Sequence, residues 1–152
     1  FRSETAEAGE IIVVEQRTGI DCGSWGSILS LGAQLKGIAG VIADGPVRDI
    51  DEARQMDFPV FGRSGTARTA RGRIAEEATD VTVTIGEVTV NPGDYVLADS
   101  SAVVFIAAAG IARVLEAAEA IAAREAEFAA ALRRGHPIGA VMGANYENLL
   151  KK

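Results

Sequence analysis

The sequence predicts an α/β protein with a mixed β-sheet, a single domain and a long C-terminal helix. Two apolar, β-branched runs, EIIVVE (10–15) and GVIAD (40–44), enclose a segment whose apolar residues recur at helical spacing. Farther on, VTVTIGEVTV (81–90) alternates with period two, as antiparallel strands do. From Ala107 to about Arg134 the chain is rich in alanine, which predicts the long helix.

Residues 10–44 form the first predicted unit, a strand, a helix and a second strand. The run 10–15 is continuously apolar, which favours a strand covered on both faces in the middle of the sheet. We expect the helix over 24–37, with Ser24 as its N-cap and Gly37 as its end. Its apolar spacing rests on Ile28, Leu31 and Leu35. We expect a right-handed crossover in this strand-helix-strand unit, as is usual between parallel strands.

The alternation of strand and helix continues after this unit. The strand 40–44 is expected to end in the turn GPVRD. Residues 47–57 then predict a short helix with Ile50 and Ala53 facing inward, and PVFGR (59–63) predicts a third strand.

The later part of the chain predicts antiparallel strands and then the long helix. Around Gly86 the period-two pattern predicts two strands, and the turn NPGD (91–94) precedes two more at 95–99 and 102–106. The helix that follows ends at Gly135, close to Pro137. Its apolar stripe comprises Ile111, Val114, Leu115, Ala118, Ile121, Phe128 and Leu132.

Composition limits the class of protein. With 152 residues, 48% of them hydrophobic, the chain fits one domain over 1–135, followed by a tail over 136–152. A net charge of -6 argues against nucleic acid as a partner. Cys22 has no second cysteine to pair with, and one His with one Cys cannot form a structural zinc site. No apolar stretch reaches membrane-spanning length, so we expect a soluble, cytoplasmic protein with no membrane partner.

The start of the chain is unusual. It opens at Phe1 without an initiator Met, in a segment, RSETAEAG (2–9), that is typical of the end of a helix. We therefore expect a truncated or processed N-terminus, and a companion chain supplying the first strands would fit the same observation.

The stretch GVIADGPVRDIDEARQMDFPVFGR (40–63) holds the main candidate site. Asp44 lies at the end of a buried strand, and a Gly-Pro turn follows it and leads to the adjacent Arg48 and Asp49. These residues are expected at the carboxyl edge of the sheet, where α/β proteins bind ligands. A carboxylate can hold a hard divalent cation while a guanidinium binds a substrate carboxylate or enolate oxygen. The alternative is a surface ion pair or a helix cap.

GSWGSIL (23–29) is the second candidate, because small residues at a helix start leave backbone N–H groups free to bind an anion. The alternative is a helix that needs glycine only for close packing. For the other polar and aromatic residues we expect structural roles. His136 is expected at an exposed helix end, Trp25 in the packed interior and Asp99 in a turn. We expect Cys22 to be an unreactive thiol and RTARGR (68–73) to be a solvated loop.

Several of these segments together resemble a known family. GVIADGPVRDIDE, FPVFGR, VTIGEVTVNPGDYVLAD and AVVFI resemble, in order and spacing, the family named for the regulator of ribonuclease activity A (RraA-like). That family includes the 4-hydroxy-4-methyl-2-oxoglutarate and 4-carboxy-4-hydroxy-2-oxoadipate aldolases. The resemblance covers nearly the whole chain and implies a swivelling β/β/α fold, a homotrimer or a pair of trimers, and an N-terminal segment that this chain lacks.

The resemblance also implies a reaction and its residues. It implies a class II pyruvate aldolase that cleaves 4-hydroxy-4-methyl-2-oxoglutarate and also decarboxylates oxaloacetate. Asp49 would hold Mg²⁺ or Mn²⁺, and Arg48 would contact the oxygen that becomes the pyruvate enolate. The pyruvyl carboxylate would bind backbone N–H groups of Gly26, Ser27, Ile28 and Leu29.

The chain departs from the family pattern at Ser27. The aldolases have Asp or Glu after the glycine matched by Gly26, and a serine supplies neither charge nor a useful proton acceptor. We therefore expect weaker metal binding, another acid substrate, or a role as a protein-binding regulator of the ribonuclease E inhibitor type. Asp44 and Asp21 are candidate substitutes by their location.

Overall fold

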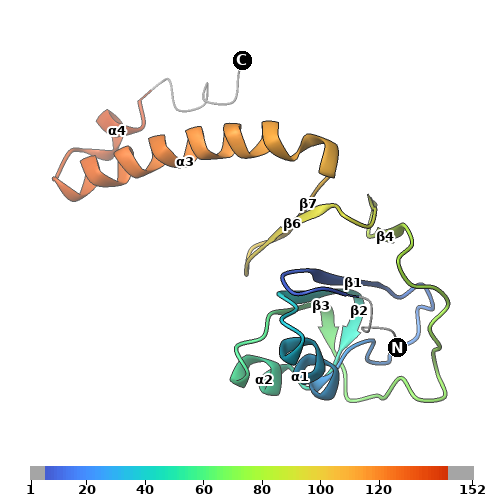
Figure 1. The fold of residues 1–152 in the computed structure, drawn as a ribbon. Coiled ribbons are helices and arrows are strands. Elements are labelled where there is room, and N and C mark those ends of the chain that lie inside the picture. Colours follow the sequence, from blue (N-terminus) through green and yellow to red (C-terminus); the bar gives the residue numbers. More distant parts are fainter. Residues whose placement is uncertain (1–5, 144–152) are drawn as a thin grey trace. The chain divides into compact units, whose positions relative to one another are not determined.

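The computed structural model describes residues 6–143 of the chain. It divides into two compact units, one ending at Phe105 and one beginning at Ile106, and each is described by itself. The α/β class and the long C-terminal helix are confirmed (Figure 1).

A three-stranded parallel sheet forms the centre of the first unit. It consists of β1 (Ile11–Glu15), β2 (Gly40–Val47) and β3 (Val60–Gly65), in the order β1-β2-β3. The predicted parallel strand-helix-strand unit is therefore confirmed. The prediction that β1 lies mid-sheet is wrong, because β2 has a strand on each side while β1 is half-buried along its length.

Strand β2 is longer than predicted. It continues past Asp44 through the Gly-Pro pair to Val47, with a register shift against β3 between Ala43 and Pro46. An irregularity of this kind accommodates a proline, which has no N–H to donate to the ladder. The strand thus carries the chain directly to Arg48.

Helix α1 (Ser27–Leu35) starts later than predicted. Its N-cap is Gly26, and Ser24 instead donates both its N–H (2.9 Å) and its hydroxyl (3.0 Å) to the Pro46 carbonyl. Through these two hydrogen bonds, Ser24 holds the loop before the helix against β2. The predicted end is confirmed, since Gly37 adopts a φ of 78° just after the last turn.

The apolar residues that predicted α1 do not face the core. Ile28, Leu31 and Leu35 are 79%, 44% and 80% exposed. The buried positions are Ser30 and Ala33, and Ser30 accepts a hydrogen bond from the Trp25 indole at 2.9 Å. The helix packs through its small residues and leaves an apolar face open.

The core of the first unit lies between the sheet and the two helices that follow β1 and β2. Helix α2 (Ile50–Gln55) buries Ala53 and packs Ile50 against this core, as predicted. The central buried residues are Trp25, Ala33, Ile38, Val41, Ala43, Val47 and Phe58.

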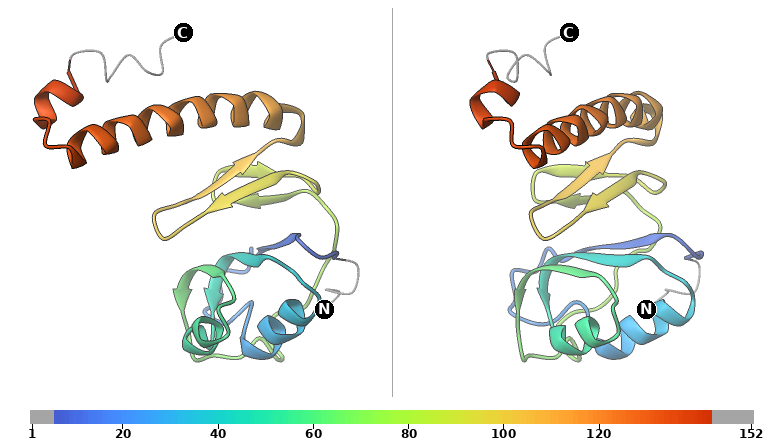
Figure 2. Two further views of the ribbon diagram at one scale, coloured as in Figure 1. Left: turned by 60° about the vertical axis from the view of Figure 1, so that its left-hand side comes forward. Right: turned by 90° about the vertical axis from the view of Figure 1, so that its left-hand side faces the viewer.

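Two short β-hairpins follow the parallel sheet. Strands β4 (Val83–Ile85) and β5 (Val88–Val90) pair antiparallel around Gly86 at a φ of 62°. Strands β6 (Tyr95–Ala98) and β7 (Val103–Ile106) form the other pair, visible in Figure 2. Parallel and antiparallel pairings thus both occur in the described residues, in three separate sheets. The predicted turn at Asp99 is confirmed, because its carboxylate accepts the N–H groups of Ser101 and Ala102.

The second unit is almost entirely helical. A short 3₁₀ turn, η1 (Ala108–Gly110), leads into α3 (Ile111–Arg133), and α4 (Ile138–Val141) follows the predicted stop at Gly135. No residue of α3 is buried. None of the helices over residues 6–143 has the length and apolarity needed to cross a membrane.

The predictions for the chain ends fall mostly outside this range. Of the helix end expected over 2–9, residues 2–5 lie outside the described residues, and residues 6–9 contain a turn at 8–9 and no helix. Of the tail over 136–152, residues 144–152 also lie outside the described residues.

Candidate functional site

Arg48 and Asp49 connect the end of β2 to the start of α2. The Arg48 N–H donates to the Trp25 carbonyl at 2.9 Å, which holds this connection against the loop before α1. Asp49 adopts φ 55° and ψ 43°, a left-handed conformation that Asp tolerates better than most residues. The chain therefore reverses here, with both side chains beside the N-terminus of α1.

The Asp49 carboxylate caps α1 from a neighbouring element. Its Oδ2 atom accepts the backbone N–H of Ser27 and the Ser27 hydroxyl, both at 3.0 Å. A Cβ at Gly26 would lie 3.0 Å from the same oxygen, so the absence of a side chain there lets the carboxylate approach. The structure thus brings together the two candidate regions that the sequence separates by some twenty residues.

The Arg48 side chain lies along Gly23 and reaches toward Asp49. A Cβ at Gly23 would lie 2.5 Å from Arg48 Cγ, so this glycine makes room for the arginine stem. Arg48 Nη2 is 3.4 Å from both oxygens of Asp49, and the side chain is 34% exposed. Among the described residues, Asp49 is the only side-chain partner of the guanidinium, so its other N–H donors are available to a ligand.

Hydrogen bonding keeps Asp49 in its charged form. The Ser27 N–H is the largest influence holding the pKa of Asp49 below its ordinary value; burial opposes it, and the Ser27 hydroxyl and Arg48 assist. The site therefore presents one ionised carboxylate beside one guanidinium. Among residues 6–143, the only partner of Asp49 Oδ1 is Arg48, through a long contact of 3.4 Å.

The proposed backbone cradle at 26–29 is partly occupied. The Ser27 N–H is taken by Asp49, while the N–H groups of Ile28 and Leu29 lie in the first turn of α1 and have no partner within residues 6–143. Gly26 contributes its carbonyl to Ser30. Two helix N–H groups and the Arg48 guanidinium therefore remain for an anion.

The structure does not bring Asp44 or Asp21 to this carboxylate. Asp44 pairs with Arg63 and accepts the N–H of Gly86 at 3.0 Å. Burial raises the pKa of Asp44, but these two hydrogen bonds outweigh burial and leave the pKa lowered. Asp21 lies 3.6 Å from Arg68. Within the described part of the chain, no cluster of three His, Cys, Asp or Glu residues could hold a metal ion.

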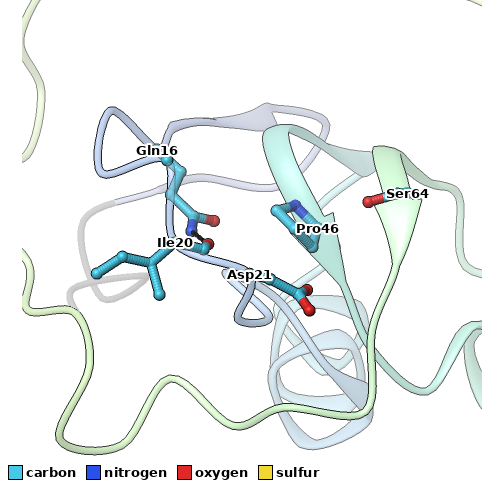
Figure 3. A pocket seen from close by; sticks show the side chains of 6 residues that line it. Gln16, Ile20, Asp21, Pro46 and Ser64 are labelled. Carbon is cyan, nitrogen blue, oxygen red and sulfur yellow. Dashed lines mark hydrogen bonds between the residues drawn. The ribbon is translucent and has the colours of Figure 1, made fainter.

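A hollow of about 280 Å³ lies at the same edge of the sheet (Figure 3). Sequence reasoning missed two of its residues, Gln16 and Ser64, although each stands at or near the carboxyl end of a parallel strand, which is the signal that could have found them. Within the part of the chain that the structure describes, the buried Oε1 atom of Gln16 has no hydrogen-bond partner. The lining comprises Gln16, Gly19, Ile20, Asp21, Pro46 and Ser64.

The remaining candidates have structural or exposed positions. Trp25 is 2% exposed, which confirms its packing role, and Cys22 is fully buried. His136 is exposed in the second unit, and RTARGR (68–73) is mostly exposed loop, both as predicted.

Fold and site together define an α/β protein with a carboxylate and a guanidinium at the carboxyl edge of a parallel sheet, beside a helix N-terminus. The sequence model of the RraA-like family, described as Aldolase/RraA, matches residues 3–105. The chain belongs to this RraA-like family.

Individual relatives agree with this assignment. A Deinococcus radiodurans protein named "Putative 4-hydroxy-4-methyl-2-oxoglutarate aldolase" is 35% identical over 63% of this chain and 59% of its own length. An uncharacterized protein from Pseudomonas syringae pv. tomato has a solved structure with a TM-score of 0.88 and 28% identity, over 93% of this chain and 71% of that one. The structure of Streptomyces coelicolor RraAS2, described as an unusual member of the RNase ES inhibitor RraA protein family, gives a TM-score of 0.71 and 27% identity. This match covers 86% of this chain and 65% of that one.

The chain is shorter than these relatives. It spans 56% and 59% of the length of two of the curated proteins that it matches.

Proposed function

We propose that this chain is a divalent-metal-dependent lyase that cleaves a 4-hydroxy-2-oxo acid, such as 4-hydroxy-4-methyl-2-oxoglutarate, and releases pyruvate. The observation that carries the proposal is the convergence of Arg48, Asp49 and the first turn of α1. Relatives named as aldolases of this type support the choice of reaction.

The site's own residues suit a 2-oxo acid. Its carboxylate would accept hydrogen bonds from the N–H groups of Ile28 and Leu29, where the helix dipole favours negative charge. The Arg48 guanidinium would donate to the oxygen on which enolate charge develops, and this stabilises the transition state more than the ground state. Oxaloacetate decarboxylation passes through the same enolate and is proposed as a second activity.

The donor set fits a weakly held Mg²⁺ or Mn²⁺. Asp49 Oδ1 is the available carboxylate oxygen, and Mg²⁺ is commonly bound by one or two carboxylates, several waters and the substrate itself. Such an ion supplies Lewis-acid polarisation of the keto oxygen when bound. With no cluster of three possible metal ligands among residues 6–143, the affinity for the ion is expected to depend on the bound acid.

Ser27 explains how the site differs from the aldolase pattern. Its hydroxyl donates to Asp49 Oδ2, so it acts on the carboxylate and provides no charge of its own. A proton acceptor for the 4-hydroxyl group would then have to be a water. We expect slower turnover than an acidic residue at this position would allow.

We also propose a homotrimer, or a pair of trimers, with the site near a subunit boundary. The exposed apolar face of α1, formed by Ile28, Leu31 and Leu35, supports this proposal because it begins beside Ser27. A contiguous exposed apolar face of this kind is a common sign of an interface.

The test is pyruvate release from 4-hydroxy-4-methyl-2-oxoglutarate and from oxaloacetate, with and without Mg²⁺. Asp49→Asn keeps an oxygen for the Ser27 N–H and removes the charge, and we expect it to abolish metal-dependent turnover. Asp51→Asn is the matched control, because the Asp51 side chain is 83% exposed and two residues away. Ser27→Asp is expected to raise kcat.

An equal loss in both asparagine variants would contradict the role of Asp49. The similarity to RraAS2 favours a second candidate, a protein-binding regulator of an RNase E-type enzyme. Absence of pyruvate release by the folded parent protein, together with inhibition of such a ribonuclease, would establish this alternative.

A further inference from the structure

The loop that follows β3 brings a second arginine, Arg68, close to the site. The Thr66 N–H donates to the Val47 carbonyl at 3.0 Å, and the Thr66 hydroxyl accepts the N–H of Arg68 at 3.2 Å. The Arg68 carbonyl then accepts the N–H of Gly23 at 2.9 Å. The backbone of Arg68 is therefore held on both sides, although its side chain is exposed.

Gly23 connects Arg68 to Arg48. A Cβ at Gly23 would lie 2.5 Å from Arg48 Cγ, so the arginine stem rests directly on this glycine. The same glycine binds the Arg68 carbonyl through its N–H. One residue without a side chain thus separates the Arg68 backbone from the Arg48 side chain, and the two arginines flank the same short loop.

The Arg68 guanidinium has a weak partner in Asp21. Its Nη1 atom lies 3.6 Å from Asp21 Oδ2, longer than an ordinary hydrogen bond, and the two side chains are 64% and 57% exposed. An exposed ion pair of this geometry contributes little free energy. Asp21 also lines the open hollow of Figure 3, which gives its side chain room to move. A ligand carboxylate can therefore take the place of Asp21 at small cost.

We propose that Arg68 binds the second carboxylate of a 2-oxo dicarboxylic acid and so determines which class of acid the site accepts. This inference rests on the proposed function, which places the first carboxylate at the N–H groups of Ile28 and Leu29 and the keto oxygen at Arg48. A five-carbon diacid extends beyond its keto group by a short chain that ends in a carboxylate. A guanidinium suits this group because two of its N–H donors match the two carboxylate oxygens.

The proposal separates two classes of acid. A diacid exchanges the weak Asp21 partner of Arg68 for its own carboxylate, whereas a monoacid of equal length leaves the Arg68-Asp21 pair as it is. Only the affinity for the diacid should therefore depend on Arg68.

The test is calorimetric binding of 2-oxoglutarate and 2-oxopentanoate to the full chain with Mg²⁺. The two acids have equal chain length and lack the 4-hydroxyl group, so binding is measured apart from cleavage. We expect the parent to bind the diacid about tenfold more tightly, and Arg68→Gln to lose this preference through weaker binding of the diacid alone. Arg71→Gln, at an exposed arginine of the same loop, should keep it.

Asp21→Asn gives a measurement that a structural role of Arg68 would not move. It removes the competing carboxylate and should tighten binding of 2-oxoglutarate with no change for 2-oxopentanoate. Asp21→Asn/Arg68→Gln should lose this gain, because the guanidinium that produces it is absent.

The outcomes separate this proposal from the lyase reaction. Equal affinity of the parent and Arg68→Gln for 2-oxoglutarate would overturn the role of Arg68, as would an equal loss for both acids. The expected binding pattern without pyruvate release from any 4-hydroxy-2-oxo acid would overturn the lyase reaction and support the diacid site. Failure of the parent to bind either acid would overturn both.

Discussion

At the scale of single residues, Asp49 has two roles that the sequence presents as alternatives. It was expected to be either a functional carboxylate or a helix cap, and the structure shows that it caps α1 through Ser27 while Oδ1 stays available. A change at Asp49 therefore alters stability as well as any chemistry, and variants must separate the two effects.

Asp49→Ala is expected to lower the free energy of unfolding by about 1 kcal/mol, the usual loss when a helix cap is removed. Asp49→Asn should lose less, since its amide oxygen can still accept the Ser27 N–H. Urea denaturation measures both, with Asp51→Ala, an exposed neighbour, as the control. Equal stability of Asp49→Ala and the control would show that the cap contributes nothing.

The lowered pKa of Asp49 predicts a pH dependence. Since the folded pKa lies below the unfolded value of about 3.9, the stabilisation is fully present above that value and is lost as pH falls through the folded pKa. The difference in unfolding free energy between the parent and Asp49→Asn should therefore shrink below about pH 4. A difference that stays constant down to pH 2.5 would contradict this account.

At the scale of elements, glycines decide how closely the strands and the site loops approach. A Cβ at Gly62 in β3 would lie 2.7 Å from both γ-carbons of Val47, which directly precedes Arg48. Gly32, in α1, has open space where its Cβ would be. The two positions make opposite predictions for the same substitution.

Gly62→Ala is expected to cost about 1–3 kcal/mol, because Val47 must move within a packed core. Gly32→Ala should instead stabilise the protein by about 0.5–1 kcal/mol, the difference in helix propensity. Thermal unfolding of the two variants checks both signs. A neutral Gly62→Ala would mean that β2 and β3 separate more easily than the packing suggests.

At the scale of the whole molecule, the two units differ in how much they bury. The first has a core around Trp25 and Val41, while α3 in the second buries no residue. A helix without a packed face is marginal in water, so its stability should depend on association.

Hydrogen exchange is expected to report this dependence. At high protein concentration the α3 amides should exchange slowly, and on dilution they should exchange quickly while those of β2 stay protected. Mass spectrometry of peptides from the two elements measures both in one sample. Protection of α3 that does not change with concentration would mean that it is covered within a single chain.

The sequence by itself determined the features that depend on neighbours along the chain. Helical spacing, period-two alternation and turn residues predicted the strands, the helices and the stops at Gly37 and Gly135, because local backbone preferences set them. The Arg48-Asp49 pair was also evident, since both residues follow a buried strand directly.

Only the tertiary structure decided which distant groups meet. Helix α1 begins at Ser27 and not at the predicted Ser24, and its apolar face is exposed. Asp44 forms an ion pair with Arg63 and does not join the site. The tertiary structure also joins Ser27 to Asp49 across 22 residues. Such contacts follow from how β2 and α1 pack against each other, and that packing is set by the shape of the whole core, which no local pattern encodes.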